Sequence, residues 1–392
     1  MRAKFDFDKP TNRRGTYSYK WNVAEGELPM WVADMDFEAP PCVKNALVER
    51  AQHGIFGYSY VPDEYFEAIS DFWASRHGWR PDPKDMIFSA GVVATISSVV
   101  RKLTTPGEKV LLQSPVYNVF YNCIGNNGRV MLSSDLVRRD GRYYIDFEDL
   151  EAKLADPQTT LMILCNPHNP VGRIWTRDEL FRIGELCKKH GVTVISDEIH
   201  CSLTDPTVPS YVPFASVSDT CRDISVTCVS VSKTFNLAGL HASAVIVHDP
   251  FLRHKVWRGI NTDEVGEPCA FAMSAAIAAY REGGEWLDAL REYLYENKEY
   301  VRRFIAENLP RLSVTPSDAT YLLWIDVSAY TDNSEQFAAK IRALTGLYVS
   351  DGVEYGHGGE GFLRLNTATQ RANIVEGMQR LKKAIEIIEK ES

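Results

Sequence analysis

The sequence predicts an α/β protein, with a large domain built on a mostly parallel sheet and a smaller α+β domain. The middle of the chain alternates apolar strand-like runs with helical patterns, which is typical of βαβ units. These runs are continuously apolar, as strands are when helices cover both faces of their sheet. The last third differs, because one long helical pattern precedes isolated strands. At 392 residues the chain is long enough for one large domain and one smaller one.

The domain bounds follow from this change of pattern. We expect residues 46–284 to form the large domain and residues 285–392 to form the small one. Residues 1–45 are expected to pack with the small domain as an N-terminal segment. The small domain is therefore predicted to be built from both ends of the chain.

Five β-branched and apolar runs predict the strands of the large domain. In chain order they are residues 109–113, 160–165, 192–196, 224–229 and 242–247. A helix is expected at 176–190, between the second and third of these strands. Thr176 suits its N-cap, Glu179 follows three residues later as in a capping box, and Gly191 is a stop signal.

The small domain is expected to begin with a long helix at 285–308. Large apolar residues recur near one face of this segment: Trp286, Leu290, Leu294, Val301 and Ile305. Strands are predicted next at 319–327 and 362–366, and a terminal helix follows them.

The composition excludes several classes of function. A net charge of −9 argues against a surface for nucleic acid or for an anionic membrane. No apolar run is long enough to span a bilayer, and the first eight residues show no signal peptide. We therefore expect a cytoplasmic protein that binds neither nucleic acid nor membranes.

The cysteines indicate packing rather than chemistry. The chain has eight, and none of them form a C-x-x-C pair. Buried reduced thiols are the expected role. Cysteine and histidine do not cluster with the spacing of metal ligands, so no metal site is expected.

The most informative segment is Ser230-Val231-Ser232-Lys233-Thr234, which directly follows a predicted buried strand. A lysine at such a strand end suits an amine held to form a Schiff base. The serines on either side could hold a phosphate. The alternative is an ordinary surface lysine in a loop.

Three other strand ends carry polar or aromatic groups. Asn169 lies in a turn stiffened by two prolines and a glycine, and the alternative is a turn without chemistry. Asp197 needs a cationic partner there, unless it is a helix N-cap or part of a structural ion pair. Tyr117 offers an aromatic face, unless it only packs in the core.

Together these residues point to one ligand. Ligands of open α/β sheets bind beyond the carboxyl ends of the strands, where all four groups are expected to converge. An amine, a carboxylate, an amide and an aromatic ring are what a flat, charged, aldehyde-bearing pyridine requires. The sequence therefore predicts a pyridoxal 5′-phosphate site.

The motifs N-P-x-N-P-x-G, D-E-x-H and S-x-S-K-T-x-N-x-x-G, in this order, resemble those of fold-type I pyridoxal-phosphate enzymes of the class I/II aminotransferase family. The resemblance covers essentially the whole chain. It is closest to the carbon–sulfur β-lyase branch, the MalY/PatB-type cystathionine β-lyases. The segments that carry this closer match are residues 29–37, 56–58, 91–93 and 232–240.

The resemblance implies a role for each site residue. Lys233 would form the Schiff base and then shuttle protons. Asp197 would pair with the pyridinium nitrogen, and Asn169 would bind the ring hydroxyl oxygen, near which His200 stands where many relatives have a tyrosine. The remaining implied roles are these: ring stacking by Tyr117, phosphate binding by Val92, Val93, Ser230, Ser232 and the neighbouring subunit's Tyr58, and substrate binding by Arg364 and Ala33.

Some of these residues have simpler readings. Arg364 alternates with leucines, so by itself it is an exposed strand residue. The alternative for His200 is a core histidine, and one of Tyr58 and Tyr60 is expected only to pack. Glu198 is expected to be structural, and His357 is expected in a loop near the site without a catalytic role.

One position departs from the family pattern. Aminotransferases of this family usually carry a phosphate-binding arginine eight residues after the lysine, where this chain has His241. The resemblance therefore supports a Schiff-base lysine more strongly than it supports a standard phosphate-binding site. The departure fits the lyase branch, in which this arginine is commonly absent.

The resemblance implies a homodimer with shared active sites that acts on a small amino acid. The first hypothesis is β-elimination from L-cystathionine, L-cysteine or related S-conjugates, with Tyr58, Tyr117 or Lys233 protonating the departing thiolate. The second hypothesis is an aminotransferase that uses a 2-oxo acid acceptor. The third is a regulatory binding protein that keeps the fold, which an intact Lys233, Asp197 and Asn169 disfavour as the sole role.

Overall fold

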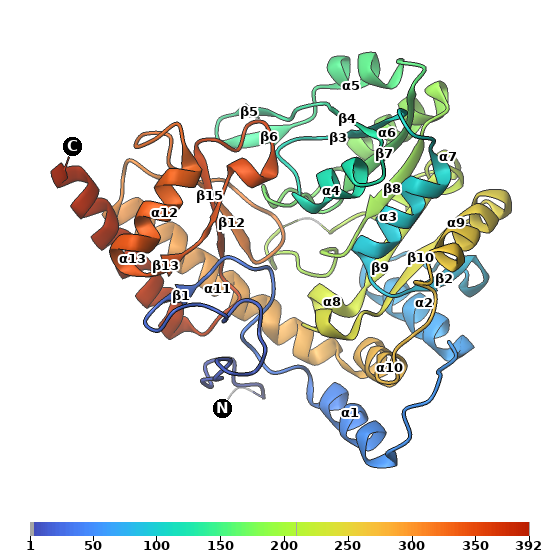
Figure 1. The fold of residues 1–392 in the computed structure, drawn as a ribbon, viewed down its shortest axis with the longest axis horizontal. Helices are drawn as coiled ribbons and strands as arrows, with labels where there is room; N and C mark the ends of the chain where they lie inside the picture. Colours follow the sequence, from blue (N-terminus) through green and yellow to red (C-terminus); the bar gives the residue numbers. More distant parts are fainter. Residues whose placement is uncertain (1–3, 209, 392) are drawn as a thin grey trace.

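The computed structural model describes residues 4–208 and 210–391, and within them a seven-stranded sheet forms the centre of the larger part of the molecule (Figure 1). Five neighbouring strands run parallel, and the strand beside them, β10, is antiparallel to both of its neighbours. In spatial order the strands are β2 (Met86–Ser89), β10 (Ser243–Ile246), β9 (Ser225–Ser230), β8 (Thr193–Asp197), β7 (Thr159–Cys165), β3 (Lys109–Leu112) and β4 (Val130–Ser133). The predicted α/β class with a mostly parallel sheet is confirmed.

The five predicted strands of this sheet are confirmed to within one or two residues at each end. Two members of the sheet, β2 and β4, were not predicted. Both are short and lie at the sheet's edges, and β4 carries an exposed Val130 and Met131. Each of these strands has an apolar run of only three residues, which is too short to mark a strand by its pattern alone.

The helix predicted at 176–190 is α6 (Arg177–His190), and it begins as the sequence indicates. The side chain of Thr176 accepts a hydrogen bond from the backbone amide of Glu179, and the Glu179 side chain reaches back to the amide of Thr176. Gly191 ends the helix with a φ of 71°, in the left-handed region that glycine tolerates.

Apolar clusters cover both faces of the large sheet. Helices α3 (Val92–Leu103) and α9 (Pro250–Thr262) contribute to one cluster, and α6 contributes to another. The remaining helices, 3-10 helices and hairpin strands of this part are α1 (Pro41–His53), α2 (Asp63–His77), η1 (Pro83–Asp85), α4 (Val119–Gly125), β5 (Val137–Arg139), β6 (Arg142–Tyr144), α5 (Phe147–Leu154), η2 (Phe214–Ser216), α7 (Asp219–Asp223), α8 (Val231–Thr234), η3 (Ala238–Leu240) and α10 (Ala272–Glu282).

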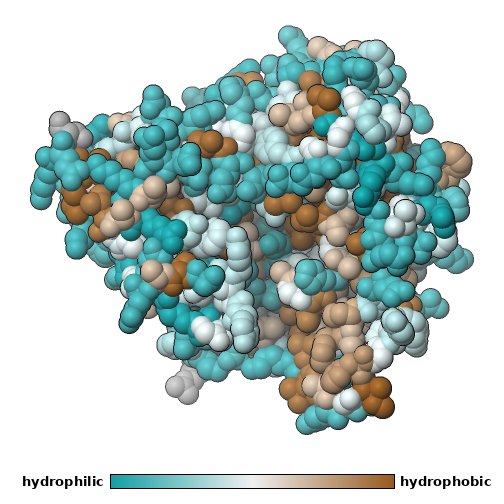
Figure 2. All heavy atoms as spheres, viewed as in Figure 1, coloured by the Kyte–Doolittle hydropathy of each residue, from teal (hydrophilic) through white to brown (hydrophobic). Residues whose placement is uncertain are grey.

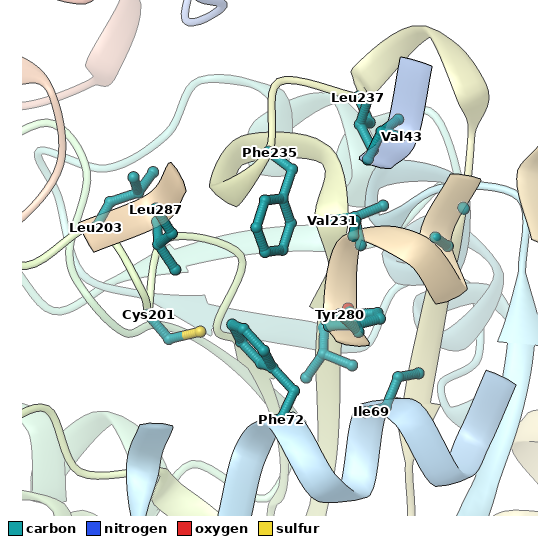
Figure 3. Packing of buried hydrophobic residues seen from close by; sticks show 14 of the residues in the cluster. Val43, Ile69, Phe72, Cys201, Leu203, Val231, Phe235, Leu237, Tyr280 and Leu287 are labelled. Carbon is teal, nitrogen blue, oxygen red and sulfur yellow. The ribbon is translucent and has the colours of Figure 1, made fainter. Parts of the chain in front are cut away.

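A third cluster anchors the turn that carries the predicted Schiff-base lysine (Figure 3). Phe235 lies at the end of this turn and is fully buried. Its ring packs edge-on against Phe72 of α2 and Tyr280 of α10, at centroid distances of 5.9 and 6.3 Å. Val231 and Leu237 belong to the same cluster. The backbone on both sides of Lys233 is therefore held by packed side chains.

The C-terminal part contains a four-stranded antiparallel sheet within the described residues. Its elements are α11 (Gly284–Asn308), β11 (Ser313–Val314), β12 (Leu322–Asp326), α12 (Ser334–Thr345), β13 (Leu347–Tyr348), β14 (Ser350–Asp351), η4 (Val353–Tyr355), β15 (Phe362–Asn366) and α13 (Arg371–Glu391). The predicted helix at 285–308, strand at 362–366 and terminal helix are confirmed. The strand predicted at 319–327 is shorter than expected, because Thr320 has a φ of 68°, which an extended strand cannot contain.

The N-terminal segment lies against this C-terminal part (Figure 1). Its strand β1 (Leu28–Pro29) pairs in parallel with β13. Leu28 and Met30 are buried in the same cluster as residues of α11, α12 and α13. The bounds 1–45, 46–284 and 285–392 remain predictions, and residues 1–3 and 392 at their outer ends lie outside the described residues.

Candidate active site

The carboxyl edge of the large sheet borders a cavity of about 510 Å³. The four strand-end residues singled out in the sequence, Tyr117, Asn169, Asp197 and Lys233, all line it. A cavity of this size is typical of sites that hold a small molecule or cofactor. The other predicted residues on its wall are Ala33, Val92, Val93, His200, Ser232 and His241.

Lys233 lies in α8, the single turn that follows β9. Its Nζ donates a hydrogen bond to the backbone carbonyl oxygen of Ala33 (2.6 Å). Burial lowers the pKa of Lys233 to about 8, while the charges of Asp34 and Asp197 oppose this shift. An amine with such a pKa is partly neutral near pH 7.5, which nucleophilic attack on a carbonyl carbon requires.

Asp197 is the last residue of β8 and is buried. Burial raises the pKa of its carboxyl group to about 6, while a hydrogen bond from the amide of Ile199 (3.1 Å) and the charge of Lys233 act against this shift. A cationic group that enters the cavity would stabilise the charged form of this buried carboxylate.

His200 lies on the same wall and is also buried. Burial lowers the pKa of its imidazole to about 3, so the ring is neutral at physiological pH. Among the described residues its Nδ1 atom has no hydrogen-bond partner. A buried polar atom without a partner at a cavity wall is suited to a ligand's hydrogen-bonding group.

Asn169 and Arg364 meet beside the cavity. Arg364 lies on β15, and its guanidinium donates to the side-chain oxygen of Asn169 (3.3 Å) and to the carbonyl oxygen of Trp31 (2.9 Å). The Arg364 side chain is buried and lies over the ring of Tyr355, with 4.8 Å between Cζ and the ring centroid. The simpler reading of Arg364 as an exposed strand residue is therefore wrong, because Tyr355 and the N-terminal segment cover its side chain.

The N-terminus of α3 forms one end of the cavity. Gly91 precedes the helix with a φ of 115°, and Val92 and Val93 begin it. The first amides of a helix have no partner within the helix and carry a partial positive charge. His241 lines the same cavity, with Nδ1 3.7 Å from the place a Cβ on Gly91 would occupy. This end is therefore suited to an anion even without an arginine at position 241.

Of the two predicted serines, Ser232 lines the cavity and Ser230 does not. Ser230 caps α8, because its side chain accepts a hydrogen bond from the amide of Ser232 (3.0 Å). It also donates to the carbonyl oxygen of Ala242 (2.7 Å). In this structure Ser230 therefore shapes the turn that carries Lys233, and its hydroxyl is already engaged.

Tyr58 is the one predicted site residue that lies far out in solvent, with a fractional exposure of 102%. It does not line the cavity of its own subunit. Tyr60 in the same segment is also exposed, at 81%. A single chain therefore does not bring Tyr58 together with the other predicted residues.

Two other residues behave as the sequence indicates. Glu198 is fully buried and accepts hydrogen bonds from Ser196, Tyr211 and the amide of Phe214, so it is structural. His357 is exposed in a glycine-rich loop, where it pairs with Asp135 (2.8 Å).

Sequence reasoning missed Tyr321 and Asn366. The hydroxyl of Tyr321 donates to the carbonyl oxygen of Ala33 (2.9 Å), the same oxygen that Lys233 contacts. The amide of Asn366 holds the carbonyl oxygens of Val32 and Asp34. Both residues lie in apolar strand-like runs, and only their polarity in a buried setting could have marked them.

The fold and the cavity together are those of an α/β enzyme with a lysine amine at the carboxyl edge of its sheet. The family model "Aminotransferase class I and II" matches residues 27–381, and the chain belongs to this family.

Three relatives are similar over nearly the whole chain. Cystathionine beta-lyase PatB of Bacillus subtilis is 46% identical over 97% of this chain and 100% of its own. Protein MalY of Escherichia coli is 33% identical over 98% of this chain and 100% of its own. The PLP-bound C–S lyase from Staphylococcus hominis has a solved structure with a TM-score of 0.91, 34% identity, and coverage of 97% of this chain and 99% of its own.

Proposed function

We propose that this protein is a pyridoxal-phosphate-dependent carbon–sulfur β-lyase. It cleaves L-cystathionine, L-cysteine or a related S-conjugate into pyruvate, ammonia and a thiol. The observation that carries the proposal is the shared cavity, in which the Lys233 amine and the Asp197 carboxylate border one space. The similarity to PatB over the full length supports the lyase reaction rather than another reaction of the same family.

The residues present fit the cofactor. The unpartnered Nδ1 of His200 and the first amides of α3, those of Val92 and Val93, supply hydrogen-bonding groups at the cavity wall. Asp197 offers a carboxylate to the ring nitrogen, Asn169 its side chain to the ring hydroxyl oxygen, and Tyr117 its ring face. When bound, the cofactor draws electrons away from the substrate Cα as its proton leaves.

The chain's own groups supply the binding and the proton transfers. Lys233 would hold the cofactor through its amine, and its Nζ would carry the Cα proton. Arg364 binds the substrate α-carboxylate through its two-pronged guanidinium. Ala33 borders the substrate from the N-terminal segment. Tyr117, with a pKa raised to about 12 by burial, keeps its proton at neutral pH and can donate it to a departing thiolate.

The proposal includes a homodimer. Ile55, Phe56 and Tyr58 are exposed on a segment without regular structure that follows α1, and Figure 2 shows an apolar patch over the region of α1 and α10. Exposed apolar patches of this kind mark protein–protein contacts. A second copy that covers this patch would bring Tyr58 to the neighbouring cavity, where its hydroxyl would bind the cofactor's phosphate.

A cytoplasmic location is part of the same proposal. All eight cysteines are free thiols, as expected in a reducing compartment. Among residues 4–208 and 210–391, no helix is both long and apolar enough to cross a membrane.

The test is to incubate the cofactor-loaded protein with L-cystathionine, without any 2-oxo acid, and to follow pyruvate and free thiol. Sustained release of both over many turnovers is expected. The family's other reaction is amino transfer to a 2-oxo acid. If product stops after one turnover and resumes only when a 2-oxo acid is added, the protein is an aminotransferase and the lyase proposal is wrong.

A further inference from the structure

The N-terminal segment crosses the cavity as an irregular strap, defined here as residues 31–37. It contains no helix or strand, so its backbone groups lack the partners that regular structure provides. Buried backbone groups must nevertheless be hydrogen-bonded. In this strap, side chains from distant parts of the chain bond most of the carbonyl oxygens, while the amide of Asp36 donates to the backbone carbonyl oxygen of Ala368 (2.9 Å).

Two asparagines hold most of the strap. Asn366, at the end of β15, donates to the carbonyl oxygens of Val32 (2.5 Å) and Asp34 (2.7 Å). Asn236 donates to the carbonyl oxygens of Met35 (3.0 Å) and Phe37 (3.1 Å). It also accepts from the amide of Met35 (3.0 Å), so its whole side-chain amide is committed to the strap.

The carbonyl oxygen of Ala33 lies between the two carbonyl groups that Asn366 holds, and the Asn236 contacts follow directly after them in the chain. It accepts hydrogen bonds from Lys233 and Tyr321. Asn236 follows Lys233 by three residues and adopts a φ of 58°, and its side chain bonds the strap. Asparagine adopts this left-handed conformation more readily than most residues do. The same short stretch of chain therefore carries the lysine and holds its acceptor.

We propose that Asn236 and Asn366 are positioning residues, whose amides hold the strap so that the Ala33 carbonyl oxygen fixes the Lys233 amine at the cavity wall. The contact serves the stages in which this amine is not bonded to the cofactor. The carbonyl then keeps the amine beside the substrate Cα instead of leaving it free to rotate through the cavity. The inference deepens the proposed function and rests on it only in taking Lys233 as the amine that bonds the cofactor.

The contact has a consequence for the charge of the amine. A carbonyl acceptor stabilises the ammonium form, so it raises the pKa of Lys233 against the effect of burial. The other charged groups that act on this amine are Asp34, Asp197 and Arg364, and the neutral His200 and Tyr321 lie nearby. Loosening the strap at Asn366, which holds the carbonyl groups on both sides of Ala33, displaces the acceptor while these side chains remain.

The experiment uses the full-length chain stripped of cofactor, and measures the rate at which pyridoxal 5′-phosphate is captured, as visible absorbance, across pH. Because the neutral amine reacts, the ratio of the rates at pH 6.5 and pH 9.5 reports its pKa. For Asn236→Ala and Asn366→Ala a fall of about one pKa unit is expected, which raises this ratio several-fold. An unchanged or lower ratio in both variants would overturn the proposal.

Asn308→Ala is the control. The Asn308 side-chain amide donates to the carbonyl oxygen of Phe304 (3.1 Å), and neither residue belongs to the strap or lines the cavity. This control variant should lower thermal stability without changing the ratio of capture rates. An equal change of the ratio in the control would mean that the strap variants act through a general loss of rigidity. If Asn236→Ala does not fold, Asn236→Ser, which keeps one polar group, replaces it.

A second readout uses the loaded enzyme and a substrate deuterated at Cα. The strap variants should show a larger isotope effect on kcat, because transfer of the Cα proton by a poorly held amine becomes slower than the other steps. The capture assay involves no carbon–sulfur cleavage. If the strap variants change the capture ratio but the protein shows no lyase reaction, only the proposed function is therefore wrong.

Discussion

The Lys233 amine is 2.6 Å from the carbonyl oxygen of Ala33, a residue 200 positions earlier in the chain. This contact makes the N-terminal segment a wall of the cavity. It also links the large sheet, which carries Lys233, to the C-terminal sheet, which holds the strap through Asn366. The site is therefore built from three parts of the chain that are far apart in sequence.

Lys233→Ala should abolish the visible absorbance of the bound cofactor and lower turnover by roughly 10⁴-fold or more. Absorbance spectra and the pyruvate assay check this. Lys298→Met is the control, because burial lowers the pKa of Lys298 to about 8 as well, and neither Lys298 nor its partner Asp205 lines the cavity. This control should lose stability and keep the absorbance. A Lys233→Ala protein that stayed yellow and active would refute the assignment.

Asp197→Asn should stabilise the cofactor-free protein at pH 7.5 and weaken catalysis by the loaded one. The native pKa of Asp197 is raised to about 6, so the carboxyl binds its proton more tightly in the folded than in the unfolded protein. Its contribution to stability is therefore present below about pH 4 and is lost as pH rises through 6, by roughly 2–3 kcal/mol. Urea unfolding should give the variant a higher free energy of unfolding than the native protein at pH 7.5, and this difference should shrink toward pH 4.5. An advantage of equal size at both pH values would contradict the assigned cause.

Arg364→Ala should raise KM by about 100-fold, because it removes charge-assisted hydrogen bonds to the substrate carboxylate. The affinity for the cofactor should change much less, and cofactor titration followed by steady-state kinetics separates the two. Arg364→Lys keeps the charge without the two-pronged geometry, so it should restore little of the affinity. Loss of cofactor with an unchanged KM would show that Arg364 serves the cofactor instead.

Tyr58 gives a test of shared active sites. Lys233→Ala and Tyr58→Phe homodimers should each be impaired, but a hybrid dimer has one site with both native residues. An equal mixture that exchanges subunits should therefore recover up to about a quarter of native activity, since half of the dimers are hybrids with one working site each. If the activity after subunit exchange equals the mean of the two homodimers, Tyr58 either acts in the active site of its own subunit or takes no part in catalysis.

Gly172→Ala should cost about 3 kcal/mol of unfolding free energy, through left-handed strain and overpacking. Gly172 has a φ of 70°, and a Cβ there would lie 2.5 Å from the Cβ of Ser317 and 2.9 Å from the carbonyl oxygen of Ala319. Gly128→Ala is the matched control, because Gly128 has a φ of 72° and open space around it. It should cost only about 1–2 kcal/mol. Equal losses in urea unfolding would mean that packing beside the Asn169 turn is not tight.

Much of the large sheet was predictable because its signals are local. Continuous apolar runs mark its buried strands, and the Thr176–Glu179 capping box marks the start of α6. The edge strands β2 and β4 were missed, because their stability comes from pairing with neighbours and not from their own pattern. The start of β12 was misjudged for a related reason, since nothing in the composition of that run reveals the left-handed Thr320.

The sequence by itself determined which chemistry-bearing residues stand at the strand ends, because the carboxyl edge of a parallel sheet gathers them whatever the details of packing. Only the tertiary structure decided which of their side chains are free. It engaged the Ser230 hydroxyl in a helix cap, buried Arg364 against Tyr355, and left Tyr58 in solvent. It also decided that Asn236 and Asn366 hold the strap against Lys233. Hydrogen bonds between residues hundreds of positions apart depend on the folded geometry of the whole chain, and no local pattern encodes them.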